Sequence, residues 1–162
     1  MQTHKQALAA GVSLIALMTG CSLFGKHQPA ATLAVHEQVD TALPENRVRK
    51  VEVPKTGLTI PINPYPALTE KDVQSAELHP TAGGAAIMLR FDIHGSMALQ
   101  ELSTRIRGGY IVTFLDGRPV AAWLVDRPID NGQMLLEGDF GEEEAKHAVE
   151  SFNSLAKKLR AR

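Results

Sequence analysis

The stretch "GGAAIMLRFDIHG", residues 83 to 95, runs directly into "SMALQELSTRIRGG", residues 96 to 109, and the two together decide the fold class. In the first part apolar and polar residues alternate, which is the pattern of a strand with one buried face. We predict a strand over residues 85–93, with Ile87, Leu89, Phe91 and Ile93 on the buried face and Met88, Arg90, Asp92 and His94 on the other.

The second part has helical spacing. Leu99, Leu102 and Ile106 recur three or four residues apart, which places them on one stripe of a helix. Ser96 is the expected N-cap, and Gly108 suits the left-handed position that follows a helix end. The sequence therefore predicts a helix over residues 96–107 directly after the strand.

Toward the C-terminus the pattern indicates a hairpin, a strand and a helix. The apolar runs "YIVTFL" and "RPVAAWLV" are joined by Asp116-Gly117, a pair able to adopt the positive φ of a tight turn. A further strand is predicted in "GQMLLEGDF", residues 132–140. The last helix should begin near Glu142, because acidic residues come first and basic residues last, which complements the helix dipole.

Toward the N-terminus the pattern is weaker. In "TGLTIPINPYP", residues 56–66, apolar residues alternate, but the prolines limit the segment to a short edge strand. In "LTEKDVQSAEL", residues 68–78, Thr69 and Asp72 form an aspartate version of a capping box. We expect a short helix to begin there.

These elements predict one α+β domain over residues 57–162, a ferredoxin-like mixed β-sheet with helices packed on one face. If strands 85–93 and 109–115 run parallel in that sheet, the crossover through helix 96–107 should be right-handed. The preceding residues 21–56 mix Gly, Pro, Gln and Ala without sustained periodicity, so we expect a flexible tether, in which "ATLAVHEQV" could form a transient helical turn.

The chain starts with Lys5, an apolar run over residues 7–18, then the small residues Thr19 and Gly20 before Cys21. This order is typical of a secretory signal peptide over residues 1–20, and the run is shorter than the ~20 residues that span a bilayer. The segment resembles the lipobox of bacterial lipoprotein precursors, which implies that Cys21 is lipidated and anchors the chain to the membrane. The alternatives are an ordinary signal peptide with a chance cysteine, or a buried structural cysteine.

Removal of residues 1–20 would leave 142 residues with 16 basic and 18 acidic side chains. No basic stripe with interleaved aromatic residues is present, so we expect no nucleic-acid partner. The resemblance to lipoproteins implies a cell-envelope location facing the periplasm. Ser22 after the anchor favours the outer membrane over the inner one in a Gram-negative cell, by the usual sorting pattern of lipoproteins.

From Thr69 to its end the chain resembles a second family, the periplasmic P1 region of the SecD protein-export subunit, specifically its base next to the membrane. The residues that carry the resemblance are "FDIHG" (91–95), Ser103, Gly108, "LDG" (115–117), Gly132, Gly138, Phe140, Glu143, Glu144 and Ala145. The chain departs from the family pattern at Ile106, Trp123 and Gly141. In SecD, membrane helices carry the proton-coupling residues. This sequence shows no such helices, so we do not expect it to act by itself as a proton-driven motor.

No catalytic motif emerges, and we expect no enzymatic activity, cofactor or metal. Asp92 and His94, two residues apart on one predicted strand face, are the best candidate metal pair, but two ligands do not make a zinc site. A small periplasmic metal-dependent protein or enzyme that uses Asp92 and His94 remains the alternative function.

Trp123 is the candidate partner-binding residue. It lies on the strand face opposite Val120, Ala122 and Leu124, and it either fills the core or anchors a partner, because tryptophan is enriched at binding hot spots. The favoured function is therefore a binding module for an envelope complex or an exported polypeptide. A structural spacer within a larger assembly is a third possibility.

Overall fold

The computed structural model describes residues 29–42, 44–81 and 84–161. The signal peptide predicted over residues 1–20 and the predicted lipidation site Cys21 lie outside the described residues.

The described residues form two helices, α1 (Ile93–Arg105) and α2 (Glu142–Arg160), and two single 3-10 turns, η1 (Glu45–Arg47) and η2 (Glu70–Asp72). The strands are β1 (Leu33–Glu37), β2 (Arg49–Val53), β3 (Leu58–Ile62), β4 (Leu68–Thr69), β5 (Val73–Thr81), β6 (Gly84–Phe91), β7 (Tyr110–Leu115), β8 (Arg118–Leu124) and β9 (Gln133–Leu136).

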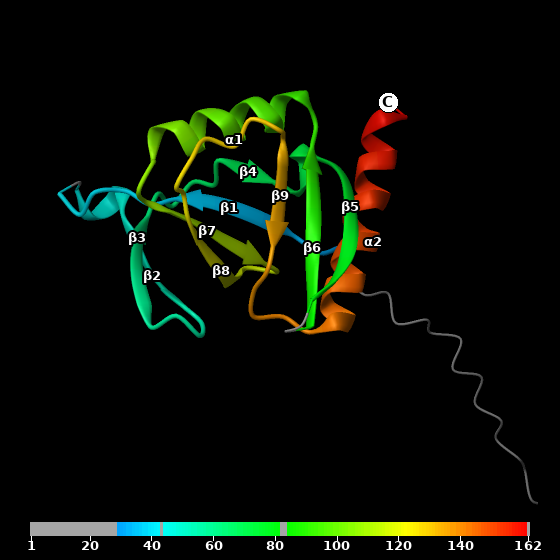
Figure 1. Cartoon of the computed structure of the whole chain (residues 1–162), viewed down its shortest axis with the longest axis horizontal. Helices are drawn as coiled ribbons and strands as arrows, with labels where there is room; N and C mark the ends of the chain where they lie inside the picture. Colours follow the sequence, from blue (N-terminus) through cyan, green and yellow to red (C-terminus); the bar gives the residue numbers. More distant parts are fainter. Residues whose placement is uncertain (1–28, 43, 82–83, 162) are drawn as a thin grey trace, which may run out of the picture.

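The strands form three sheets, ordered β4-β1-β7-β8, β2-β3 and β5-β6-β9, and every described strand pair is antiparallel. The predicted α+β class is confirmed. The arrangement of the strands differs from a single mixed sheet, because β6 and β7 belong to different sheets and are not parallel neighbours. Helix α1 carries the chain from one sheet to the other, and α2 lies beside β5 (Figure 1). Alternation within each strand cannot distinguish one sheet from two, since both have an apolar face.

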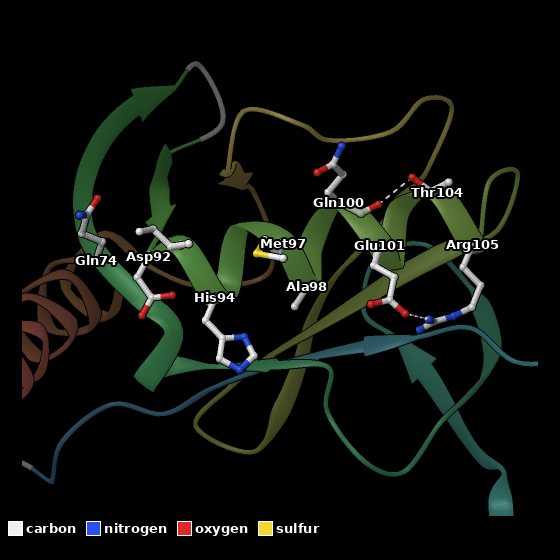
Figure 2. A pocket seen from close by; sticks show the side chains of 10 residues that line it. Gln74, Asp92, His94, Met97, Ala98, Gln100, Glu101, Thr104 and Arg105 are labelled. Carbon is white, nitrogen blue, oxygen red and sulfur yellow. Dashed lines mark hydrogen bonds and ion pairs between the residues drawn. The ribbon is translucent and has the colours of Figure 1, made fainter.

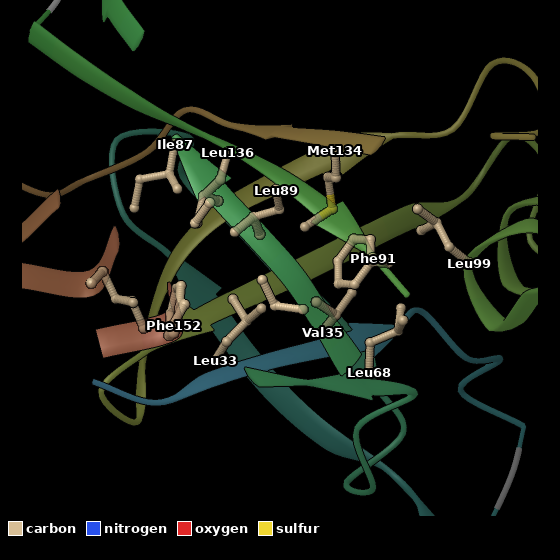
Figure 3. Packing of buried hydrophobic residues seen from close by; sticks show 14 of the residues in the cluster. Leu33, Val35, Leu68, Ile87, Leu89, Phe91, Leu99, Met134, Leu136 and Phe152 are labelled. Atoms are coloured by element: carbon tan, nitrogen blue, oxygen red, sulfur yellow. The ribbon is translucent and has the colours of Figure 1, made fainter. Parts of the chain in front are cut away.

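The main core lies between the two larger sheets and the helices. Its fully buried side chains include Leu33, Val35, Leu68, Ile87, Leu89, Leu99, Leu136 and Phe152 (Figure 3). Asn153 ties α2 to β5, because its side-chain amide donates to the Ala76 carbonyl at 2.8 Å and its oxygen accepts from the Ala76 N–H at 2.9 Å. The last helix, predicted to begin near Glu142, is thus confirmed.

Part of the predicted tether is folded, so the prediction of a flexible segment over residues 21–56 is wrong for β1 and β2. Strand β1 lies between β4 and β7, inside its sheet, and Leu33 and Val35 are buried in the main core. Within residues 31–39, Leu33–Glu37 form a strand in place of the expected transient helical turn. The alternation of Leu33, Val35 and Glu37 extends over only five residues. It is too short to predict a strand in a segment that also contains Pro, Gln and Gly.

The short helix expected after Thr69 is a single 3-10 turn. The capping box forms as predicted, since the Thr69 N–H donates to Asp72 Oδ2 at 2.7 Å and the Lys71 N–H donates to the Thr69 hydroxyl at 3.4 Å. The chain then enters β5 instead of continuing as a helix. Pairing of β5 with β6 along eight residue pairs outweighs the local helix signal.

Strand β6 ends two residues earlier, and helix α1 begins three residues earlier, than the sequence indicated. Asp92 is the N-cap of α1 and accepts the Gly95 N–H at 2.8 Å, whereas Ser96, the expected cap, lies inside the helix. Ile93 therefore leaves the strand, and its side chain is 83% exposed instead of buried. Leu99 and Leu102 are buried as predicted. The Asp116-Gly117 turn is also confirmed, with φ values of 50° and 78°.

Candidate functional site

The strongest candidate site is a cleft between the edge strands β8 and β9, which we call the β8–β9 cleft. Its volume is about 330 Å³, and it is lined by Thr113, Ala121, Ala122, Trp123, Met134, Leu135, Leu136 and Glu137. Strand β8 is the last strand of one sheet and β9 is the last strand of the other, so each presents an unpaired edge.

One backbone contact closes the lower end of the cleft. The Asp139 N–H, just after β9, donates to the Val120 carbonyl in β8 at 2.8 Å. Gly138 allows this approach, because a Cβ at that position would lie 2.5 Å from the same carbonyl oxygen. Apart from this contact, β8 and β9 belong to different sheets and form no strand pairing with each other.

Trp123 lies on the wall of the cleft with 42% of its surface exposed, and it belongs to neither buried core cluster. A β-bulge opposite Thr113 and Phe114 changes the alternation along β8. As a result Val120 and Ala121 pack in the main core, while Ala122 packs against a second buried cluster. That cluster consists of Val51, Val53, Ile60, Ile62, Val112 and Phe114. Val120 and Ala122, which were predicted to share one strand face with Leu124, therefore pack in different clusters. The interpretation of Trp123 as a core-filling residue is wrong, because its side chain is exposed.

Leu135 and Glu137 also line the cleft, and neither was predicted from the sequence as a site residue. Met134 and Leu136 are buried, whereas Leu135 between them is 42% exposed. Three consecutive apolar residues in one strand, "MLL", require that at least one faces outward, and this was the available signal. The sequence does not indicate which neighbouring strand Leu135 and Glu137 would face, because that depends on tertiary packing.

A second surface, larger and more open, lies along α1. It has a volume of about 1230 Å³ and is lined by residues of β5 and α1 that include Gln74, His94, Met97 and Arg105 (Figure 2). Arg105 is held by Glu37 at 2.7 Å and by Glu101 at 2.9 Å. Ile93 and Met97 are its exposed apolar residues, at 83% and 66%.

Asp92 and His94 do not share a strand face. Asp92 accepts a hydrogen bond as the helix N-cap, and His94 is exposed in the first turn of α1. Among the described residues no three His, Cys, Asp or Glu side chains lie close enough together to hold a metal ion. Asp92→Ala would remove a helix cap and lower stability whatever its function, so His94→Ala is the cleaner test of the alternative function.

A buried histidine lies under the β2–β3 ribbon. His36 is 4% exposed, its Nδ1 donates to the Asn63 carbonyl at 2.8 Å, and its ring packs edge-on against Phe114. Burial lowers the pKa of His36 below its ordinary value of 6.5, the hydrogen bond to Asn63 opposes this, and the nearby Arg49 cation lowers it further. Phe114 also contacts the Arg49 guanidinium and belongs to the cluster that joins the ribbon to β7.

We expect the free energy of unfolding to fall as the pH is lowered from about 7.5 to about 5.5. The unfolded chain takes up a proton at His36 near pH 6.5, whereas the folded chain, with its lowered pKa, does so only at lower pH. The contribution of this group is at most ~1.4 kcal/mol per pH unit. Urea unfolding at a series of pH values measures it. His36→Gln, which cannot titrate, should show a flatter profile, and identical profiles would contradict the assignment.

Among residues 29–42, 44–81 and 84–161, no helix combines the length and the apolar character needed to span a membrane. Comparison of the sequence with known protein families gives no match, and none of the curated proteins matches it significantly.

Solved structures do match the fold. One is SecDF, described as a membrane component that enhances protein export, with 21% identity, a TM-score of 0.58, and coverage of 77% of this chain and 63% of that chain. Another is SecDF in a super-membrane-facing form, with 23% identity, a TM-score of 0.58, and coverage of 77% of this chain and 19% of that chain. This chain therefore spans less than two thirds of either matched chain. At this identity the likeness concerns the fold alone, and the expected SecD P1-like α+β fold is confirmed.

Proposed function

We propose that this chain is a non-enzymatic, lipid-anchored protein of the cell envelope whose SecD P1-like domain acts by binding another protein. The observation that carries the proposal is the β8–β9 cleft, where an exposed tryptophan lies between two unpaired strand edges. Exposed apolar side chains grouped at one site are typical of protein-interaction surfaces. By contrast, the described residues hold no cluster of candidate metal ligands that would favour the alternative function.

The anchor and the location of this proposed function rest on the sequence. A lipidated Cys21 would tether the domain to a membrane on the periplasmic side, in the outer membrane if Ser22 has its usual sorting role. The folded part reaches back at least to Leu33 in β1, so at most about a dozen residues separate the anchor from the domain. The domain is thus proposed to act close to the membrane surface.

The partner is proposed to be either an envelope complex or a polypeptide in export. The likeness of the fold to SecDF, which is described as enhancing protein export, supports the second. A permanent structural spacer would differ in that its partner stays bound.

In-cell photo-crosslinking tests the function. A photoreactive residue is placed at position 123 in the cleft, or at position 97 on the outer face of α1 as a matched exposed control. The full chain is expressed at its native level, and adducts are identified by mass spectrometry. We expect adducts from position 123, and translocon subunits or nascent exported chains among them would assign an export role. Absence of adducts from both positions would contradict a binding function.

A further inference from the structure

We propose that the β8–β9 cleft binds an extended polypeptide segment as an added β-strand, and that this segment carries alternating apolar residues and a basic residue. The inference rests on the proposed binding function and deepens it, because it names the mode of binding and the chemistry of the partner.

The free backbone groups of β9 can be assigned from the pairing. Phe91 donates its N–H to the Gly132 carbonyl, and Phe91 and Gly132 continue the register that pairs Arg90 with Gln133. In an antiparallel ladder, bonded and non-bonded pairs alternate. The pair of Met88 with Leu135 is therefore a non-bonded one, so the Leu135 N–H and carbonyl point away from β6 and into the cleft.

The free backbone groups of β8 follow from its pairing with β7. The Val125 N–H donates to the Gly109 carbonyl, in register with the pairing of Ile111 with Trp123. Ala122 and Leu124 are then at non-bonded positions, and their backbone groups point away from β7. The Val120 carbonyl at the same edge already accepts a strand-like hydrogen bond from the Asp139 N–H.

These groups favour a strand over other occupants. Unpaired N–H and carbonyl groups along a strand edge are completed by an extended backbone, which offers groups at matching spacing. A bound helix has satisfied its own backbone groups, and a lipid chain has none to offer.

The side chains that line the cleft define what the added strand should carry. Trp123 and Leu135 are both exposed at 42% and supply apolar surface for alternate residues of the added strand. Glu137 is the one charged residue in the lining, and no described residue forms an ion pair with it. A carboxylate beside an apolar wall is complementary to a lysine or arginine on the partner.

Fluorescence anisotropy with labelled peptides tests the inference. The probe is a peptide of about seven residues, Lys-Val-Thr-Val-Thr-Val-Lys, and its counterpart has glutamate in place of both lysines. The full-length protein is titrated into each peptide. We expect saturable binding of the lysine peptide with a Kd below about 1 mM, and binding of the glutamate peptide that is weaker by about tenfold.

Variants separate backbone pairing from side-chain contact. Leu135→Pro removes the outward N–H without removing a bond to β6, and should weaken binding by about tenfold. Leu135→Thr keeps that N–H and should weaken binding less than Leu135→Pro does. Trp123→Ala removes the apolar wall and should also weaken binding. Ile93→Ala, an exposed apolar residue on α1, is the matched control and should bind as the wild type does.

The thermal unfolding midpoint of each variant shows whether it folds. If Leu135→Pro does not fold, the comparison of Trp123→Ala with Ile93→Ala decides. No saturable binding of the lysine peptide, or equal binding by Trp123→Ala and the wild type, would overturn the inference. Crosslinks in cells from position 97 alone would also overturn the inference, but they would leave the proposed binding function intact. Absence of crosslinks from both positions would overturn both the inference and the proposed binding function.

Discussion

Val35→Asp is expected to abolish cooperative folding. Val35 is fully buried in β1, paired with Leu68 on one side and Thr113 on the other. An aspartate there would place a carboxyl group in the main core without a hydrogen-bonding or ion-pair partner, at a cost of at least several kcal/mol. Since domains of this size are stable by ~5–15 kcal/mol, this cost removes most or all of the stability.

Circular dichroism during urea unfolding measures the effect. The control is Thr41→Asp, which adds the same charge at an exposed position of the same N-terminal region. It should change the unfolding free energy by no more than ~0.5 kcal/mol. A folded Val35→Asp variant with wild-type stability would mean that residues 33–37 act as part of a tether after all.

Phe152→Ala should give the second largest effect, a loss of ~3–5 kcal/mol in the free energy of unfolding. Phe152 is fully buried where α2 meets the main core, as Figure 3 shows, and truncation would leave a cavity that the two sheets cannot close. The matched control is Leu159→Ala in the same helix, where the side chain is 40% exposed.

Differential scanning calorimetry compares the two variants. The midpoint of Phe152→Ala should fall by about 10 °C or more, whereas that of Leu159→Ala should change by only a few degrees, about a third of this or less. Equal shifts would show that α2 is held mainly by its polar contacts, such as that of Asn153 with Ala76.

The candidate site could be predicted only in part. Trp123 was identified from composition, since a lone tryptophan on an alternating strand must face either the core or a partner. The cleft around it could not be predicted, because Leu135 and Glu137 come from a strand of another sheet, and nothing local to either strand indicates that their edges face each other. The prediction that Asp92 and His94 share a strand face was wrong, because the strand ends at Phe91.

The sequence by itself determined the elements whose signals are local. The Asp116-Gly117 turn, the alternation of β6 as far as Phe91 and the charge-ordered α2 each depend on residues within a few positions of one another, and each formed as predicted. The tertiary structure alone decided how the strands were divided among sheets, that β1 belongs to the domain, and that the segment after Asp72 becomes β5. These outcomes depend on hydrogen bonds and buried surface shared with residues far away in the chain, such as the pairing of β1 with β7, and a local pattern carries no record of its distant partner.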